Sequence, residues 1–317
     1  MTSRDLVRAA IAHQQTPRVP YCIGYTADGA SQLERLIGAG RSADEFTDND
    51  VVRVGPPWWH WHQLGPDWGR PPTPTSRDTV RGGGSYEAFF DQLKRLHDET
   101  GKYLLVTIYG SHFEKAYFSR GIENFLADMA GDPPFARQLL RRIVERNLVM
   151  LENVLACPEA DGVLLGSDWG TQVDLIMSPQ TWRDMIRPGE QEEYDLVHSF
   201  DLDVWIHSCG NVQRIIPDLI DMGVQVLNPV QPECMDLHYL KQAYGERLTF
   251  WGGVSTQQTL PYGTPDEVRA ESRRVRDLMS RGGGYVFSPA QEIQGDVPAE
   301  NIMALIEVAR ETRREPA

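Results

Sequence analysis

From residue 103 onward, short runs of β-branched and aliphatic residues alternate with amphipathic stretches of helical periodicity. Such alternation predicts parallel βα units, because each strand must be followed by a helix that covers the sheet. Two earlier runs, 18–25 and 51–54, bring the count to about eight, the number in a (β/α)₈ TIM barrel. We therefore expect an α/β fold with one barrel domain over residues 1–317. The later predicted strands are 103–109, 162–166, 203–207, 224–227, 248–251 and 285–287.

Helix start signals support this alternation. Thr264 precedes Pro265 and lies three residues before Glu267, which predicts a capping box and a helix to about residue 281. Ser178 and Ser85 are predicted N-caps of two further helices. The segment near 56–84 departs from the pattern because it is rich in Trp, Pro and Gly, and is predicted to be a long loop insertion.

Charge and cysteine content exclude several classes of partner. The formal net charge of -14 disfavours nucleic acid and anionic membranes as the main partner, so a small molecule or another protein is expected. The 4 cysteines do not form a disulfide framework in a chain of 317 residues, and the sequence starts without a secretory pattern. No apolar run reaches the roughly 20 residues that span a bilayer. We predict a cytoplasmic protein.

The motif His207-Ser208-Cys209 sets an imidazole and a thiol two residues apart at the end of an apolar run. Residues two apart on a strand share one face, so both side chains could bind one zinc ion. A different interpretation is that Cys209 is a buried small hydrophobe and His207 a hydrogen-bonded core residue.

Polar and aromatic residues follow most of the predicted strands. In a TIM barrel the active site lies at the carboxyl ends of the strands, so these positions are the candidate pocket. We expect Asp168 and His207 to be catalytic, although Asp168 could instead cap the next helix or pair with Arg120. The loop residues could form a lid or an aromatic wall. The predicted substrate-binding residues are Tyr25, Trp58, His60, Tyr109, His112, Gln231 and Trp251.

A series of motifs resembles the uroporphyrinogen decarboxylase superfamily, and within it the decarboxylase-like branch related to corrinoid-dependent methyltransferases. The similarity runs nearly end to end. It includes Arg18-Val19-Pro20, the segments 120–124, 168–172 and 178–179, His207-Ser208-Cys209-Gly210-Asn211, the segments 228–231 and 251–253, and 296–301. The resemblance implies a TIM barrel and a homodimer, but does not fix the reaction.

Two departures from the family pattern bear on function. Authentic decarboxylases carry an arginine-containing motif after the first strand, whereas this chain has the segment 21–28 without arginine, which disfavours haem biosynthesis. In the methyltransferase branch a late Cys completes the zinc site, and this position falls on Gln291. The acidic donor of that branch falls on Gln231. A neutral amide is a poorer zinc ligand than a thiolate. Glu292 or Cys234 could compensate.

The resemblance favours a methyltransferase in which zinc activates a thiol, with His207, Cys209 and Gln291 as metal residues. A corrinoid protein would dock over the barrel mouth, where Trp58 to Trp61 could form the contact. Two alternatives remain open. One is a metal-independent decarboxylase or lyase in which Asp168 and His207 move protons. The other is a barrel that binds a small ligand or a corrinoid protein without turnover.

Overall fold

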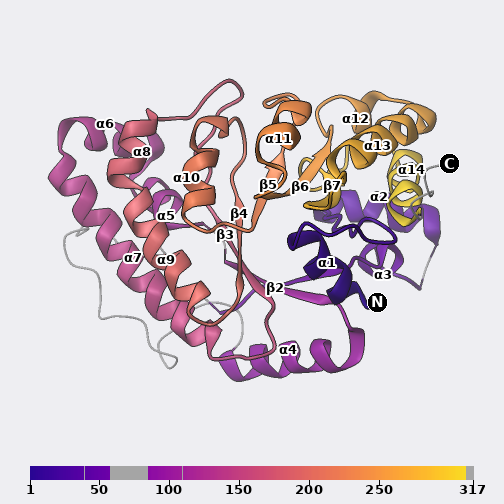
Figure 1. Cartoon of the computed structure of the whole chain (residues 1–317), viewed down its shortest axis with the longest axis horizontal. Coiled ribbons are helices and arrows are strands. Elements are labelled where there is room, and N and C mark those ends of the chain that lie inside the picture. The colour runs from indigo at the N-terminus through magenta and orange to yellow at the C-terminus, as the bar shows by residue number, and fades with distance from the viewer. Residues whose placement is uncertain (39, 58–84, 109, 312–317) are drawn as a thin grey trace.

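A computed structural model of the chain describes residues 1–38, 40–57, 85–108 and 110–311. Seven parallel strands form one curled sheet in the order β1 to β7, with helices outside it (Figure 1). The strands are β1 Val51–Val54, β2 Tyr103–Ile108, β3 Gly162–Gly166, β4 Asp203–His207, β5 Val226–Val230, β6 Thr249–Val254 and β7 Tyr285–Pro289. The prediction of an α/β barrel is therefore confirmed.

The helices lie mostly between successive strands, as the alternation predicts. They are α1 Ser3–Ile11, α2 Ala27–Ile37, α3 Ala43–Thr47, α4 Tyr86–Thr100, α5 His112–Arg120, α6 Ile122–Gly131, α7 Pro133–Leu155, α8 Pro179–Met185, α9 Arg187–His198, α10 Ile216–Asp221, α11 Leu237–Tyr244, α12 Thr259–Tyr262, α13 Pro265–Met279 and α14 Ala299–Arg310, with a 3₁₀ turn η2 at Gln213–Ile215. The predicted caps are confirmed, because the side chains of Ser85, Ser178 and Thr264 each accept a hydrogen bond from a first-turn backbone N–H.

The predicted first strand, 18–25, differs from the prediction. It forms only isolated parallel bridges, from Tyr21 to Phe287 and from Tyr25 to Ile293. On its other side, backbone groups bond to side chains: Ile23 N–H donates to Asn49 Oδ1 and Tyr21 N–H donates to Asp50 Oδ2. The segment therefore lies between β7 and β1, but side chains replace part of its strand ladder.

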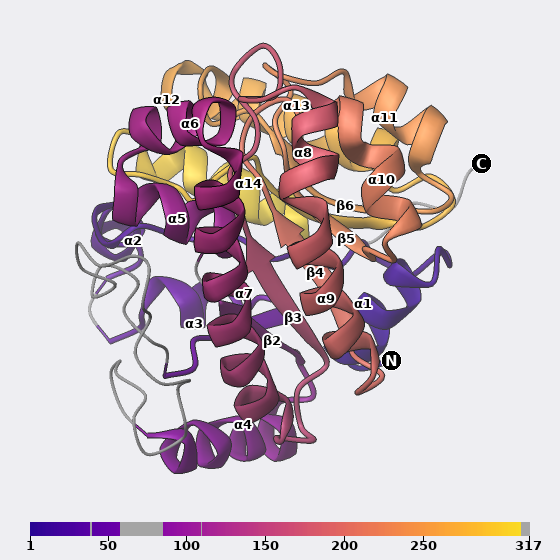
Figure 2. The same cartoon turned by 90° about the vertical axis from the view of Figure 1, so that its left-hand side faces the viewer.

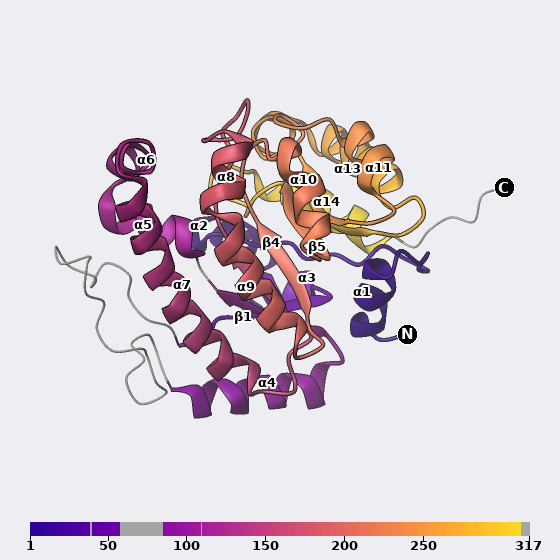
Figure 3. The same cartoon turned by 60° about the vertical axis from the view of Figure 1, so that its left-hand side comes forward.

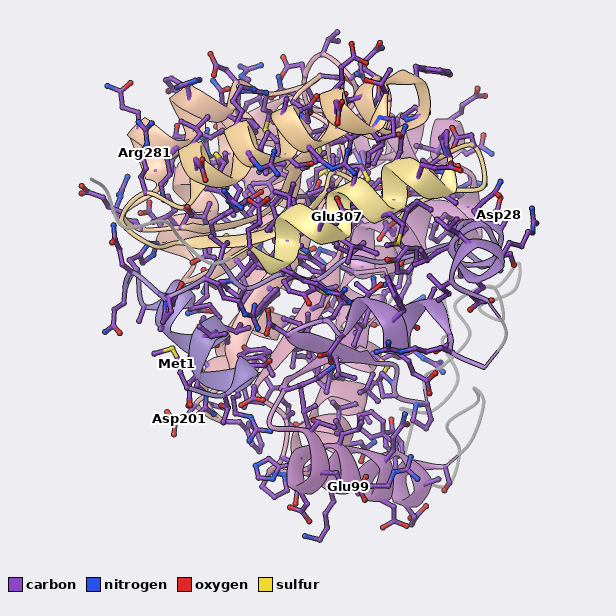
Figure 4. The ribbon with its side chains drawn as sticks, turned by 90° about the vertical axis from the view of Figure 1, so that its right-hand side faces the viewer. Met1, Asp28, Glu99, Asp201, Arg281 and Glu307 are labelled. Carbon is purple, nitrogen blue, oxygen red and sulfur yellow. The ribbon has the colours of Figure 1, made fainter. Side chains whose placement is uncertain are left out.

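Helices cover the outside of the sheet in contiguous layers. Figure 2 shows α7 and α9 side by side over β3 and β4. Figure 3 shows α4 running across the end of the molecule away from α6 and α8. On another side α13 and α14 lie together, and Glu307 of α14 accepts from Arg269 Nε at 2.8 Å (Figure 4). Within the described residues, no helix is long and apolar enough to span a membrane.

The barrel interior is filled by alternate residues of the strands, as the two-residue repeat of a strand requires. Val51, Tyr103, Leu105, Leu164, Trp205, Val226, Trp251 and Val286 form one buried cluster. The rings of Trp205 and Trp251 meet edge to face at 5.4 Å. Helix α1 packs against β1, β2 and β7. Above this packed interior, the carboxyl ends of the strands leave space for a ligand.

Candidate metal centre and its cavity

A cavity of about 370 Å³ lies at the carboxyl ends of the strands. On five strands, the residue two positions after a member of the apolar cluster lines this cavity. These residues are Arg53 on β1, Thr107 on β2, Gly166 on β3, His207 on β4 and Ser288 on β7. His207 is in register with Gly166 on one side and with Asn228 on the other. The cavity is thus built by strand alternation at the position where barrels of this type bind ligands.

Asp168, His207 and Cys209 come together in this cavity. One ligand atom from each lies within 4.8 Å of the other two, and no other such group of His, Cys, Asp or Glu occurs in the described part of the chain. Cys209 Sγ is 3.4 Å from His207 Nε2, which is 3.8 Å from Asp168 Oδ1. The backbone N–H of Cys209 donates to Asp168 Oδ1 at 2.8 Å and so ties the loops after β3 and β4 together.

The orientation of the His207 ring is set by Asn228. Asn228 Nδ2 donates to the Trp251 carbonyl, so Asn228 Oδ1 is the atom that faces the ring. His207 Nδ1 lies 2.6 Å from this oxygen and must therefore carry the proton. Nε2 is the ring nitrogen that faces Asp168 and Cys209. Metal-binding histidines are commonly held in this way through their second nitrogen.

The donor set fits zinc. One carboxylate, one imidazole and one thiol supply three ligands of the kinds that zinc prefers, and a three-ligand protein site leaves a fourth position for substrate. Asp168 is half-exposed, with 39% of its side chain accessible, whereas Cys209 is more enclosed. Burial, together with the neighbouring Asp168, raises the pKa of the Cys209 thiol to about 12.

Gln291 lies beside the three ligand candidates but presents its amide nitrogen to them. Its Nε2 donates to Cys209 Sγ at 3.3 Å, and its Oε1 accepts from the backbone N–H of Glu292. Glu292 lines the cavity and pairs with Arg53 at 2.8 Å. Cys234, whose carbonyl accepts from Asn211, is outside the group of three. Asp168, rather than Gln291, is therefore the third candidate ligand beside His207 and Cys209.

Glu114 is a cavity residue that the sequence analysis missed. It lies in the first turn of α5, is 6% exposed and accepts from the Tyr117 hydroxyl at 3.2 Å. Burial, with a further contribution from Asp168, raises the pKa of its carboxyl to about 7. Its neighbours His112 and Lys115 point away from the cavity, so only the helical register could have distinguished it.

Among the predicted substrate-binding residues, Trp251 lines the cavity. His112 does not, because it is fully buried and hydrogen-bonds through Nε2 to the Ile186 carbonyl. Tyr25 bonds to the Thr47 hydroxyl, and Gln231 accepts from the backbone N–H of Gly210. Arg120, the alternative partner of Asp168, pairs with Asp128. The predictions for Trp58, His60 and Tyr109 fall outside the described residues.

Comparison with known proteins assigns the chain to a family. The family model for "Uroporphyrinogen decarboxylase (URO-D)" matches residues 73–312. The chain belongs to the uroporphyrinogen decarboxylase family. The resemblance found in the sequence is thereby confirmed, and members of this family with known activities include both decarboxylases and methyltransferases.

Relatives of this uroporphyrinogen decarboxylase family member include two methyltransferases. The methylcobamide:CoM methyltransferase MtaA of Methanosarcina barkeri is 31% identical over 131 residues, which are 41% of this chain and 36% of that protein. The methylated-thiol:coenzyme M methyltransferase of Methanosarcina mazei is 22% identical over 70% of this chain and 56% of that protein. The matches thus span about a third to a half of these relatives.

A solved structure with the same fold is the methyltransferase from Methanosarcina mazei. It superposes with a TM-score of 0.71, covers 98% of both chains and is 19% identical in sequence. At this identity the likeness establishes the fold.

Proposed function

We propose that this protein is a zinc-dependent methyltransferase that methylates a small thiol. The observation that carries the proposal is the convergence of Asp168, His207 and Cys209 on one cavity, with ligand atoms within 4.8 Å of one another. The names of the relatives add support, because MtaA is a methylcobamide:CoM methyltransferase and its Methanosarcina mazei relative acts on methylated thiols.

The side chains would divide the work as follows. Asp168, His207 and Cys209 would hold the zinc, and the hydrogen bond to Asn228 would keep the His207 ring in position for it. When bound, zinc supplies a Lewis acid that lowers the pKa of the substrate thiol and makes its sulfur nucleophilic at neutral pH. Trp251 and the apolar cluster below it exclude water from the reacting sulfur.

In the proposed reaction, the methyl group moves from a donor to the sulfur of the thiol. A sulfur–carbon bond forms as the bond between the methyl carbon and its donor breaks, and the donor keeps the electron pair of that bond. The thiol proton leaves to solvent. A corrinoid carried by a partner protein that docks over the barrel mouth is the methyl donor we propose, and we propose a homodimer as the assembly.

Methyl transfer can be measured with free methylcobalamin as donor. We expect the zinc-loaded protein to convert methylcobalamin and a small thiol to cob(I)alamin and the methyl thioether, as followed by anaerobic absorbance and mass spectrometry of the product. Asp168→Asn should remove this activity. Failure of the zinc-loaded protein to form a thioether with any small thiol would contradict the proposal.

The raised pKa of Glu114 favours a second candidate, a metal-independent decarboxylase. A carboxyl whose pKa is raised to about 7 suits proton transfer to a carbanion at neutral pH. Carbon dioxide release from small carboxylic acids by protein treated with a chelator would support this reaction instead.

A further inference from the structure

Charged side chains occur around the cavity in a fixed order. Arg53 lies on β1, Glu114 follows β2, the metal candidates Asp168, His207 and Cys209 follow β3 and β4, and Glu292 follows β7. Because the strands are ordered β1 to β7 in the sheet, the cavity presents a cation, then a carboxylate, then the metal corner. This order indicates what kind of molecule the cavity suits.

Arg53 is the one lysine or arginine among the described residues that line the cavity. A Cβ at residue 24 would lie 2.6 Å from Arg53 Nη2 and 3.2 Å from Glu292 Cγ, so Gly24 makes room for this ion pair. In this pair, Arg53 Nη2 donates to Glu292 Oε1 at 2.8 Å. A guanidinium has five N–H donors, so Arg53 retains donors for a second carboxylate.

Glu114 presents a carboxylate on the other side of β2. Its Oε1 accepts from Tyr117, whereas its Oε2 lies next to Gly110 and Gly166, which also line the cavity. The neighbouring Lys115 donates to Asn147 Oδ1 in the helix layer, and its effect on the pKa of Glu114 is smaller than the opposing effects of burial and Asp168. A buried carboxylate is costly unless a cation or donor faces it. A ligand with an ammonium group would supply that cation.

We infer that the thiol substrate is an α-amino acid, with its sulfur at the Asp168–His207–Cys209 corner, its ammonium group at Glu114 and its carboxylate at Arg53. This inference rests on the proposed function. In an α-amino acid, the ammonium and the carboxylate are attached to the same carbon. This arrangement suits Arg53 on β1 and Glu114 after β2, because these two strands are neighbours in the sheet. A thiol that carries only an anionic group would leave Glu114 without a cation.

The test compares thiols that differ in their charged groups. Homocysteine carries both groups, 4-mercaptobutyrate lacks the ammonium, and 3-mercaptopropylamine lacks the carboxylate. The fourth thiol, 2-mercaptoethanesulfonate, lacks the ammonium and carries a sulfonate on a shorter chain. Binding is read on the Co²⁺-substituted protein from the sulfur-to-cobalt charge-transfer band, with no methyl donor present. We expect homocysteine to bind about tenfold or more tightly than each of the other three.

Variants assign each charged group to its residue. Glu114→Gln should remove the advantage of homocysteine over 4-mercaptobutyrate and keep its advantage over 3-mercaptopropylamine, whereas Arg53→Met should do the reverse. Glu123→Gln, on the exposed side of α6, is the charge-matched control and should change neither ratio.

The outcomes separate this inference from the proposed function. If the thiols bind but homocysteine has no advantage in the unmodified protein, the amino-acid assignment is wrong and thiol activation stands. The same conclusion follows if neither variant changes the ratios. If no thiol perturbs the cobalt spectrum, both the proposed function and this inference are overturned.

Discussion

Helix α5 contributes to two clusters of polar side chains. The side chains of one cluster face the cavity, and those of the other bond to one another between helices. The cavity cluster comprises Glu114, Asp168, His207 and Cys209, whose ligand atoms face a space large enough for a small molecule. The helix-layer cluster comprises His112, Lys115, Asn147, Glu190 and Glu193, all at most 1% exposed. In that layer Lys115 donates to Asn147, and Asn147 donates to Glu193.

The comparison teaches that burial alone does not mark a functional residue. His112 is more deeply buried than Glu114, and burial lowers the pKa of its imidazole to about 3, yet it faces helices α8 and α9. Glu114 keeps an oxygen beside the cavity. We therefore assign substrate chemistry to the cavity cluster and stability to the helix-layer cluster, and the following substitutions test that division.

The largest expected effect is on catalysis at the cavity cluster. Cys209→Ala should lower thiol methylation by roughly a thousandfold or more, because loss of one ligand removes several kcal/mol of charge stabilisation. The melting temperature should stay nearly constant. Steady-state kinetics and circular dichroism measure both. Cys234→Ala, half-buried and outside the ligand group, is the matched control, and an equal loss of activity in this control would contradict the assignment.

The helix-layer cluster should respond in stability. Lys115→Met removes the ammonium that donates to Asn147 and lowers the pKa of the buried Glu193, which should cost about 3–5 kcal/mol of unfolding free energy. Urea denaturation measures this loss. Lys94→Met removes an exposed pair with Asp98 and should have no measurable effect. A Lys115→Met protein as stable as the parent would contradict the assignment of the helix-layer cluster to stability.

Glu114 should make stability depend on pH. The folded pKa of about 7 lies above the ordinary carboxyl value of 4.5, so the contribution of Glu114 to the free energy of unfolding is fully present below pH 4.5 and is lost as pH rises through 7. Glu114→Gln does not undergo this loss. The free energy of unfolding of the variant should exceed that of the parent protein by up to about 3 kcal/mol at pH 8 and should equal it near pH 4.5. Denaturation at the two pH values measures the difference, and a pH-independent difference would refute the raised pKa.

The smallest expected effect concerns the orientation of His207. Asn228→Ala removes the acceptor for Nδ1–H and should weaken zinc binding by about 10- to 100-fold. Asn228→Asp retains an acceptor and should bind zinc nearly as well as the parent protein. Competition with a chromophoric chelator measures both affinities. Equal weakening in the two variants would mean that the amide acts through packing.

Much of the fold could be predicted because strand and helix signals are local. The strands 103–109, 162–166 and 203–207 are confirmed to within a residue over the described part of the chain, as are the caps Ser85, Ser178 and Thr264. The segment 18–25 could not be predicted in full, because its backbone partners include the side chains of Asn49 and Asp50.

The candidate site was only partly predictable for a related reason. His207 ends β4 and Cys209 follows it two residues later in the loop, so their proximity is local. Asp168 joins them through a hydrogen bond from the Cys209 backbone, which links two loops that are distant in sequence. The orientation of the Gln291 amide, which directs its nitrogen at Cys209 Sγ, also depends on tertiary contacts.

The most direct test of the metal centre is the metal content of untagged protein purified without chelators, measured by plasma mass spectrometry beside a His207→Ala/Cys209→Ala variant. We predict about one zinc ion per chain in the parent protein and none in the variant. A parent protein that holds no zinc after zinc has been supplied and the excess removed would contradict the assignment of Asp168, His207 and Cys209 as a metal centre.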